Sequence, residues 1–264
     1  MIEMAIIGAG RMGYAIAASW VRNHVILPRQ LILADPLRSA RRRAAALGCR
    51  VTPDPAAAAR IARSVLLAVK PQVISHTAGR MGREVRGKRV ISILAGTTRR
   101  RLARLLPGAR IIRAMPNTPL LVGAGAIVLS TDGTSPADLR FASRLFASMG
   151  RVFLVPERRM NVVTALSGSG PALYCAFLES LSGAAKRAGL PADLSESLAV
   201  QTLAGTGQLL RIGPRLSPRR LREMVTSPGG TTEAALAIFK RRRLGEVARE
   251  AIRAAVRRGI QLSH

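Results

Sequence analysis

The sequence predicts an α/β protein with a doubly wound parallel sheet over residues 1–155 and an all-helical domain over residues 156–264. Three observations support this prediction. Short apolar runs alternate with helix-like segments up to about residue 155, as in a parallel sheet that is covered on both faces. A glycine-rich turn separates the first apolar run from the first helix. From Glu157 onward the periodicity is helical, and no convincing strand is found.

Composition limits the classes of protein to consider. Of the 264 residues, 48% are hydrophobic and 3% aromatic, so the core is built mainly from Ala, Leu, Ile and Val. The formal net charge of +28 comes mostly from arginines spread along the whole chain. Because few aromatic side chains can stack on bases, we expect solvated helix faces rather than a nucleic-acid site. Any binding to nucleic acid would be nonspecific.

Nothing in the sequence indicates a membrane segment. The longest uncharged run (160–178) is interrupted by Ser167-Gly168-Ser169-Gly170-Pro171, a break that a spanning helix would not contain without partners. The first apolar run breaks at Gly8, unlike the core of a signal peptide. We therefore expect a cytoplasmic protein with no membrane partner. The histidines and cysteines lack ligand spacing, so we expect no metal site.

The first strand and helix enclose a Gly-x-Gly-x-x-Gly turn. Gly8 permits the turn, Gly10 lets a pyrophosphate approach the backbone, and Gly13 lets the helix pack on the strand. The free N–H groups of the helix then face a phosphate. This pattern predicts a Rossmann-type dinucleotide site, and the alternative is a purely structural glycine turn. The candidate cofactor contacts here are Ile7, Gly8, Ala9, Gly10, Arg11 and Met12.

The second strand, 31–34, ends at Asp35. A carboxylate there usually binds a ribose 2′-hydroxyl and repels a 2′-phosphate, which favours NAD. However, Arg38, Arg41 and Arg42 follow within a turn or two, and any of them could hold that phosphate. The residues therefore leave NADH and NADPH both open. The next helix, 37–47, ends at a glycine, which is a normal helix stop.

The later strands end in loops on the ligand side of such a sheet. A short strand at 51–52 and a helix from Pro55 precede the strand 64–69, which is apolar on both faces like a central parallel strand. Strands at 90–94 and 110–114 follow, and 125–130 is the last strand. Ligands bind at the carboxyl ends of parallel strands. The loops that begin at Lys70, at Ala95 and at Met115 are therefore candidates for cofactor contacts.

Residues 156–264 are predicted to form helices separated by Gly- or Pro-containing breaks. The helices cover 171–188, 193–211, 218–225, 232–242 and 244–258. Several are apolar on more than one face. A small helical domain with surplus apolar surface usually buries it against a second subunit, so we expect a homo-oligomer.

A second candidate site lies between two of these helices, in Val225-Thr226-Ser227-Pro228-Gly229-Gly230-Thr231-Thr232. Pro-Gly-Gly allows unusual backbone angles, so consecutive N–H groups can turn toward one anion. Thr231 and Thr232 then open a helix and add hydroxyls to its positive end. The segment fits a carboxylate site and, equally well, an ordinary helix cap after a proline turn.

Over essentially its full length the chain resembles the pyrroline-5-carboxylate reductase family. The matching stretches are 8–13, 68–72, 113–119, 163–172, 188–191 and 224–232. The resemblance implies a Rossmann domain joined to a helical domain that interlocks with a second subunit as a homodimer. It also implies hydride transfer from NADPH or NADH to the C=N carbon of 1-pyrroline-5-carboxylate, which gives L-proline.

The resemblance assigns roles to individual residues. The backbone around Ser227, Gly230 and Thr231 would hold the substrate carboxylate, and Thr232 would hydrogen-bond the ring nitrogen as the catalytic residue. The implied substrate contacts are Val225, Ser227, Gly229, Gly230, Thr231 and Thr232. Beyond the glycine turn and Asp35, the implied cofactor contacts are Ala68, Val69, Lys70, Pro71, Ala95, Gly96 and Asn117.

Three residues depart from the family's pattern. Pro55 stands where the family commonly has an asparagine that touches the cofactor. Leu173 takes the place of a usual aromatic residue, and Arg215 aligns with an acid found in some relatives. Two alternatives stay open beside the main interpretation. One is a paralogous reductase for a different cyclic imine, and the other is a non-catalytic basic binding protein on the same fold.

Overall fold

The computed structural model describes residues 1–212 and 216–262. Contacts within the chain divide it into two compact units. The first unit contains Met1–Pro171 together with the chain from Ala254 onward, and the second contains Ala172–Arg253. Arg215, one of the three departures from the family's pattern, lies outside the described residues.

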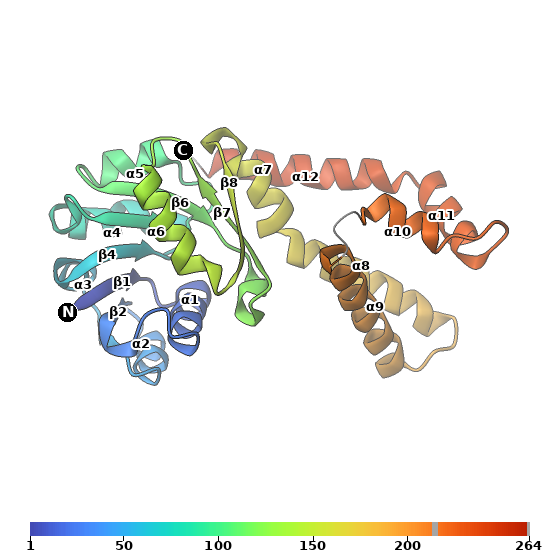
Figure 1. Ribbon diagram of the computed structural model, residues 1–264, viewed down its shortest axis with the longest axis horizontal. Coiled ribbons are helices and arrows are strands. Elements are labelled where there is room, and N and C mark those ends of the chain that lie inside the picture. Colours follow the sequence, from blue (N-terminus) through green and yellow to red (C-terminus); the bar gives the residue numbers. More distant parts are fainter. Residues whose placement is uncertain (213–215, 263–264) are drawn as a thin grey trace. The chain divides into compact units, whose positions relative to one another are not determined.

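The first unit is organised around an eight-stranded sheet (Figure 1). Its strands are β1 (Ile2–Ile7), β2 (Leu31–Ala34), β3 (Arg50–Thr52), β4 (Ala62–Leu67), β5 (Arg89–Ser92), β6 (Arg110–Met115), β7 (Gly125–Ser130) and β8 (Gly150–Val155). They follow the order β3-β2-β1-β4-β5-β6-β7-β8. The order of the first six strands is that of a Rossmann-type sheet, which confirms the predicted fold class.

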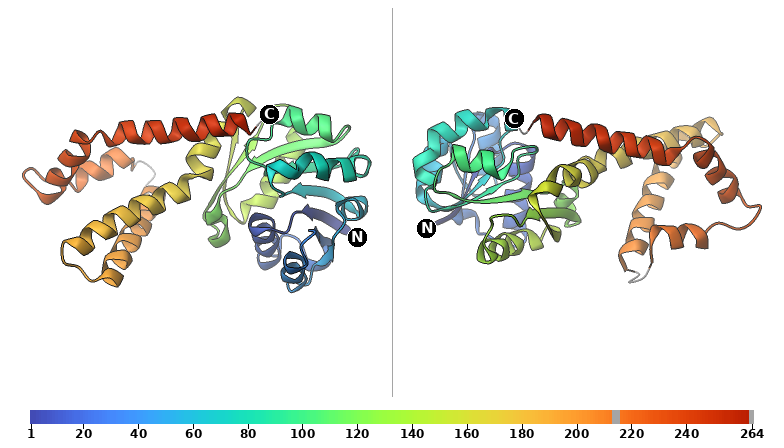
Figure 2. Two further views of the ribbon diagram at one scale, coloured as in Figure 1. Left: turned by 180° about the vertical axis from the view of Figure 1, so that it is seen from behind. Right: turned by 90° about the horizontal axis from the view of Figure 1, so that it is seen from above.

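Helices cover both faces of this sheet (Figures 1 and 2). They are α1 (Arg11–Arg22), α2 (Arg38–Ala45), α3 (Pro55–Ile61), α4 (Ile74–Met81), α5 (Arg99–Leu105) and α6 (Pro136–Ala147). Met4 and Ile6 of β1 belong to a buried cluster with Trp20 of α1 and residues of α2 and α6. The alternate side chains, Ala5 and Ile7, belong to a second cluster with α3, α4 and α5. The central strand is therefore buried on both faces, as its apolar run predicts.

The far edge of the sheet differs from the sequence-based prediction. β7 pairs antiparallel with β6, with Met115 opposite Val128. The connection between Met115 and Gly125 is too short for the crossover of a dozen or more residues that a parallel neighbour needs. β8, which the sequence analysis missed, pairs parallel with β7 at the edge of the sheet. None of its side chains is fully buried, although residues 152–155 form an apolar run.

The second unit is helical and has almost no core of its own. Its helices are α8 (Gly170–Arg187), α9 (Ala192–Ile212), α10 (Pro218–Met224), α11 (Thr231–Arg241) and the first part of α12 (Leu244–Gln261). Among the described residues from 172 to 253, only Ser195 is buried. Large apolar side chains such as Tyr174, Phe177 and Leu198 are exposed. Burial of apolar area stabilises a fold, so this unit lacks a main source of stability within one chain.

Several shorter elements belong to the first unit. The short helix α7 (Met160–Val163) continues through a π-helical turn at Thr164–Gly168 into α8. Short 3-10 turns lie at Pro28–Gln30, Pro71–Val73, Gly82–Val85, Thr118–Val122 and Glu157–Arg159. No described helix has the length and apolar character that crossing a bilayer requires.

Candidate functional site

The glycine-rich turn has the backbone geometry that a dinucleotide site requires. Gly8 has a φ of 101°, and its N–H donates to the carbonyl of Ala34 at 2.8 Å. A Cβ on Gly8 would lie 2.7 Å from the carbonyl oxygen of Ala68. A Cβ on Gly13 would collide with the carbonyl of Gly8. Only glycine fits at these two positions, which explains the turn and the close packing of α1 on β1.

Gly10 differs from the other two glycines because it faces open space. It is exposed, and nothing lies within 4 Å of the place where its Cβ would be. Gly10 is also the N-cap of α1, where no side chain caps the helix and the first turn has no acid. The positive end of α1 is therefore left without a side-chain cap, beside open space at Gly10. This arrangement fits the pyrophosphate of a dinucleotide.

Replacing Gly10 with alanine is expected to weaken NADP⁺ binding while leaving the fold intact. The new methyl group has room in the free chain but would occupy the space needed for the pyrophosphate. Overpacking of this kind costs about 1–3 kcal/mol, which corresponds to a roughly five- to 150-fold rise in Kd. Calorimetric titration with NADP⁺ measures the change. Gly79→Ala is the matched control, since Gly79 is exposed on α4 with equally free space, and an unchanged Kd in Gly10→Ala would contradict the assignment.

Asp35 lies at the end of β2, beside the glycine turn. Its Oδ2 accepts the N–H of Ala9 at 2.8 Å, and its Oδ1 accepts the N–H of Leu37 at 2.9 Å. The guanidinium of Arg41 donates to the carbonyls of Asp35 and Pro36. Arg41 is thus occupied with the backbone, and Arg38 is exposed at the start of α2.

The other predicted cofactor contacts lie in the loops that follow β4 and β5. Ala68 and Val69 are half-buried next to Gly8, and the exposed Lys70 leads into the 3-10 turn that begins at Pro71. Ala95 is half-buried. Gly96 is buried instead: a Cβ there would lie 2.7 Å from the Cβ of Leu262, which follows α12. The missing side chain of Gly96 therefore makes room for the end of α12.

Asn117 uses both ends of its amide within the chain. Its Nδ2 donates to the carbonyl of Ser167 at 3.1 Å, and its Oδ1 accepts the N–H of Ala126 at 2.8 Å. The side chain thereby links β7 to the π-helical turn. Pro55, the departure near the cofactor side, is buried at the first position of α3, where a missing N–H is harmless.

The segment between α10 and α11 has two of its glycine N–H groups engaged internally. Gly229, with a φ of 71°, donates its N–H to Oε2 of Glu233 at 2.7 Å. Gly230 donates its N–H to the carbonyl of Ser227 at 3.0 Å. Gly230 is the N-cap of α11 and provides no side-chain cap. The candidate anion donors are therefore the first-turn N–H groups and the hydroxyls of Thr231 and Thr232.

The sequence analysis did not single out Glu233, which fixes the conformation of Gly229. The signal was present, because Glu233 stands three residues after the N-cap, as in a capping box. The glutamate also places a negative charge at the positive end of α11. Glu233 therefore shapes the segment in which the substrate carboxylate is expected. The glycine turn belongs to the first unit and this segment to the second.

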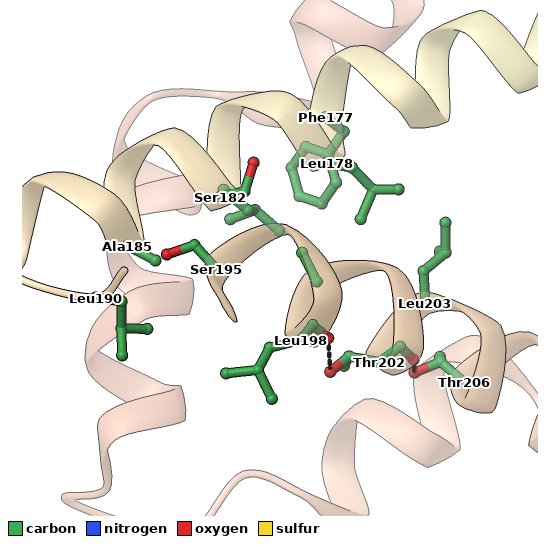
Figure 3. A pocket seen from close by; sticks show the side chains of 12 residues that line it. Phe177, Leu178, Ser182, Ala185, Leu190, Ser195, Leu198, Thr202, Leu203 and Thr206 are labelled. Carbon is green, nitrogen blue, oxygen red and sulfur yellow. Dashed lines mark hydrogen bonds between the residues drawn. The ribbon is translucent and has the colours of Figure 1, made fainter. Parts of the chain in front are cut away.

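A groove of about 440 Å³ lies between α8 and α9 (Figure 3). Phe177, Leu181, Leu198 and Leu203 are among its apolar lining residues. Its hydroxyl groups, those of Ser182, Ser195, Thr202 and Thr206, each donate to a backbone carbonyl of the chain. The groove thus offers apolar surface rather than polar groups that would orient a small ligand.

Two family models match the chain. Residues 3–96 match a family described as "NADP oxidoreductase coenzyme F420-dependent". Residues 157–262 match one described as "Pyrroline-5-carboxylate reductase dimerisation". The first match includes the glycine turn, and the second includes the groove and the segment between α10 and α11.

Curated proteins match along the whole chain. A pyrroline-5-carboxylate reductase from Synechocystis sp. is 38% identical over 264 residues, covering 99% of this chain and 98% of the relative. One from Haemophilus influenzae is 34% identical and covers 98% of this chain and 97% of the relative. Both matches extend across the two units.

Solved structures agree with these relatives. A pyrroline-5-carboxylate reductase from Coxiella burnetii has a TM-score of 0.90 and 32% identity, covering 100% of this chain and 99% of that chain. A pyrroline carboxylate reductase from Plasmodium falciparum, solved with NADP bound, has a TM-score of 0.89 and 25% identity, covering 100% and 98%.

Proposed function

The chain belongs to the pyrroline-5-carboxylate reductase family, and we propose that it reduces 1-pyrroline-5-carboxylate to L-proline with NADPH or NADH. The relatives confirm the family that the sequence resembles, and the similar structure solved with NADP bound supports a nicotinamide cofactor. The observation that supports the proposal most directly is the 38% identity over essentially the whole of both chains. The open space at Gly10, beside the uncapped end of α1, adds a place where the pyrophosphate fits.

We assign cofactor binding to residues 1–155, and substrate binding and dimerisation to residues 156–264. The bound nicotinamide supplies the hydride. The N-terminus of α1 holds the pyrophosphate through backbone N–H groups next to Gly10. The remaining proposed cofactor contacts, from Ala68 to Asn117, lie in the loops after β4, β5 and β6. These loops lie at the carboxyl ends of their strands, where a dinucleotide binds in such a sheet.

The start of α11 is the proposed substrate site. The N–H groups of the first turn of α11 and the hydroxyl of Thr231 hold the carboxylate at the positive end of the helix. The hydroxyl of Thr232 hydrogen-bonds the ring nitrogen and orients the C=N bond. A protonated imine is already electrophilic, so positioning supplies much of the rate without a strong general base.

Replacing Thr232 with alanine is expected to lower kcat roughly ten- to a thousandfold, because one oriented hydrogen bond to the reacting group is lost. Thr232→Ser keeps the hydroxyl and should recover most of the rate. Thr226→Ala is the matched control, since the Thr226 hydroxyl already donates to the carbonyl of Arg222 at 2.7 Å. Steady-state kinetics measures kcat for each variant. A wild-type kcat in the alanine variant would show that Thr232 has no catalytic role.

The test of the function itself is a steady-state assay with authentic 1-pyrroline-5-carboxylate and each nicotinamide. We expect oxidation of the cofactor that depends on the imine and yields L-proline. No turnover with either cofactor would overturn the proposal. A parallel assay with a six-membered cyclic imine tests the paralogue alternative, which a clear preference for the larger ring would support.

We propose that the high positive charge of this enzyme does not indicate a nucleic-acid site. We also propose a cytoplasmic location. The structure describes a Rossmann-type sheet and helices whose exposed arginines are widely spread. Retention on DNA that is lost at modest salt, together with normal turnover, would fit nonspecific attraction. Strong retention without any turnover would instead support the non-catalytic alternative.

We also propose that the second unit forms an interlocked homodimer. Its apolar surface is unpartnered within one chain, and the family model over 157–262 is a dimerisation model. Several of these exposed apolar side chains line the groove between α8 and α9. The four hydroxyls that line it all donate to backbone carbonyls of the same chain. A second copy of the chain, with the same surplus of apolar side chains, fits such a surface.

A further inference from the structure

The carboxylate of Asp35 is committed to the backbone on both of its oxygens. Asp35 is 9% exposed, and Oδ2 and Oδ1 accept the N–H groups of Ala9 and Leu37 at 2.8 and 2.9 Å. Hydrogen bonds to an ionised acceptor are stronger than those between neutral groups. The free chain therefore holds this carboxylate firmly in one orientation.

The residue that Asp35 holds lies inside the pyrophosphate-binding turn. Ala9 stands between Gly8 and Gly10 and is fully buried. Its N–H bond to Asp35 connects the turn to the end of β2, while Gly8 connects the same turn to Ala34 through its own N–H. Two neighbouring N–H groups of the turn are thus fixed by the β2 end of the sheet. The conformation that leaves Gly10 open depends on these contacts.

From this geometry we propose that Asp35 is a positioning residue that holds the cofactor turn through Ala9, and that it does not select between NADH and NADPH. The proposal rests on the proposed function only in that a nicotinamide dinucleotide binds at this turn. Selection then falls to the side chains after Asp35. Arg38 is exposed at the first position of α2, while Arg41 is held by the carbonyls of Asp35 and Pro36.

A positioning role for Asp35 predicts different cofactor affinities from a role in binding the ribose. A carboxylate that binds the ribose and repels a 2′-phosphate would discriminate between the two cofactors, so its removal would change the ratio of their affinities. A carboxylate that only shapes the turn contributes equally to both affinities. The ratio of the two dissociation constants therefore separates the two roles.

The experiment measures the Kd of NADP⁺ and of NAD⁺ by calorimetry on the full-length protein, without imine substrate. Asp35→Ala is expected to weaken both by about tenfold and to change their ratio by less than about threefold. Arg38→Ala is expected to weaken NADP⁺ alone, since only that ligand carries the 2′-phosphate. Because turnover is not measured, the result does not depend on which imine the enzyme reduces.

Asp35→Asn serves as a second variant if the alanine form fails to fold, since it keeps the shape and one acceptor oxygen. Ser135→Ala is the matched control for stability. Ser135 caps α6 by accepting the N–H of Asp138, which pairs with Arg89 at the amino end of β5, away from the ligand edge. The control is expected to lower Tm by roughly 2–4 °C with both Kd values unchanged.

The decisive result is the affinity ratio in the Asp35 variants. An unchanged ratio with both affinities weakened supports the positioning role. Tighter NADP⁺ binding together with weaker NAD⁺ binding, or a ratio shifted tenfold or more, would overturn it and place the carboxylate at the ribose. Unchanged affinities for both ligands would also overturn it, because the turn would then keep its shape without Asp35.

Discussion

Replacing Leu198 with glutamate is expected to separate the proposed homodimer into monomers. Leu198 lines the groove between α8 and α9 and is 50% exposed in the single chain. A charge left unpaired in a buried position costs about 3–5 kcal/mol, which raises the dimer Kd roughly 150- to several thousandfold. Because each subunit carries the substitution, the two sites of a symmetric dimer are both affected.

Light scattering coupled to size exclusion, at micromolar concentration, measures this effect. Leu198→Met is the matched control, since methionine keeps an apolar side chain of similar volume and should leave the dimer intact. The glutamate variant is also expected to lose helix content, because the second unit has only Ser195 buried among its described residues. NADP⁺ binding should persist, since the first unit contains its own buried core.

A glutamate variant that stays dimeric, with wild-type helix content, would show that the groove is not covered by a second copy. In that case another face of the second unit would have to bury its apolar side chains. Monomers with full helix content and full activity would contradict the wider argument, since they would show that the unit needs no partner for stability.

The elements that the sequence predicts well are those whose pattern is local. The apolar runs at 4–7 in β1 and 65–67 in β4 are buried on both faces of the sheet, so they identify these strands. The turn at Gly8 is encoded in the spacing of its glycines. The antiparallel direction of β7 is not visible in its own residues. It follows from the connection after β6, which is too short for the crossover that a parallel strand needs. β8 contains an apolar run at 152–155, but a run this short does not by itself distinguish a strand from a helix.

The same distinction applies to the candidate site. The open space at Gly10 belongs to a local glycine motif, whose spacing can be read from the sequence. Asp35 and Asn117 are directed by N–H groups that folding brings near, those of Ala9 and Ala126. Sequence periodicity does not predict which backbone N–H group a given side chain will bind. The residues of a site are therefore easier to predict from the sequence than the hydrogen-bond partners of each side chain.

Replacing Glu157 with glutamine is expected to destabilise the first unit by about 3 kcal/mol at neutral pH. The carboxylate lies 2.7 Å from the guanidinium of Arg113, which is 3% exposed, and also accepts the N–H of Arg99 at 3.0 Å. The variant leaves the charge of Arg113 buried without an anion. Glu157 itself is 22% exposed, so we expect the lower end of the usual cost of breaking a buried pair.

The pH dependence of stability gives a second measure of this ion pair. Burial by itself raises the pKa of Glu157, but the charge of Arg113 and the N–H of Arg99 outweigh it and hold the pKa below its ordinary value of 4.5. A carboxyl whose pKa is lower in the folded state stabilises the fold fully above its unfolded pKa. That contribution is lost as the pH falls from about 4.5 through the folded value.

Urea unfolding between pH 7 and pH 3 tests both statements on the same protein. The wild type should lose stability over this acid range, and Glu157→Gln should lose less because it has no carboxyl to protonate there. Glu84→Gln is the matched control: Glu84 pairs with Arg60 at 3.1 Å, but that arginine is 61% exposed, so the cost should stay below about 1 kcal/mol.

A double variant separates the cost of an unpaired charge from the value of the pair. Arg113→Met with Glu157→Gln removes both charges, so no unpaired charge is left buried. We therefore expect the double variant to be more stable than Glu157→Gln alone. If the single variant were as stable as the wild type at pH 7, Arg113 would not need Glu157 as its counter-ion. In that case hydrogen bonds to backbone N–H groups would hold Glu157 in place. One of these is the bond that the N–H of Glu157 donates to Asp132.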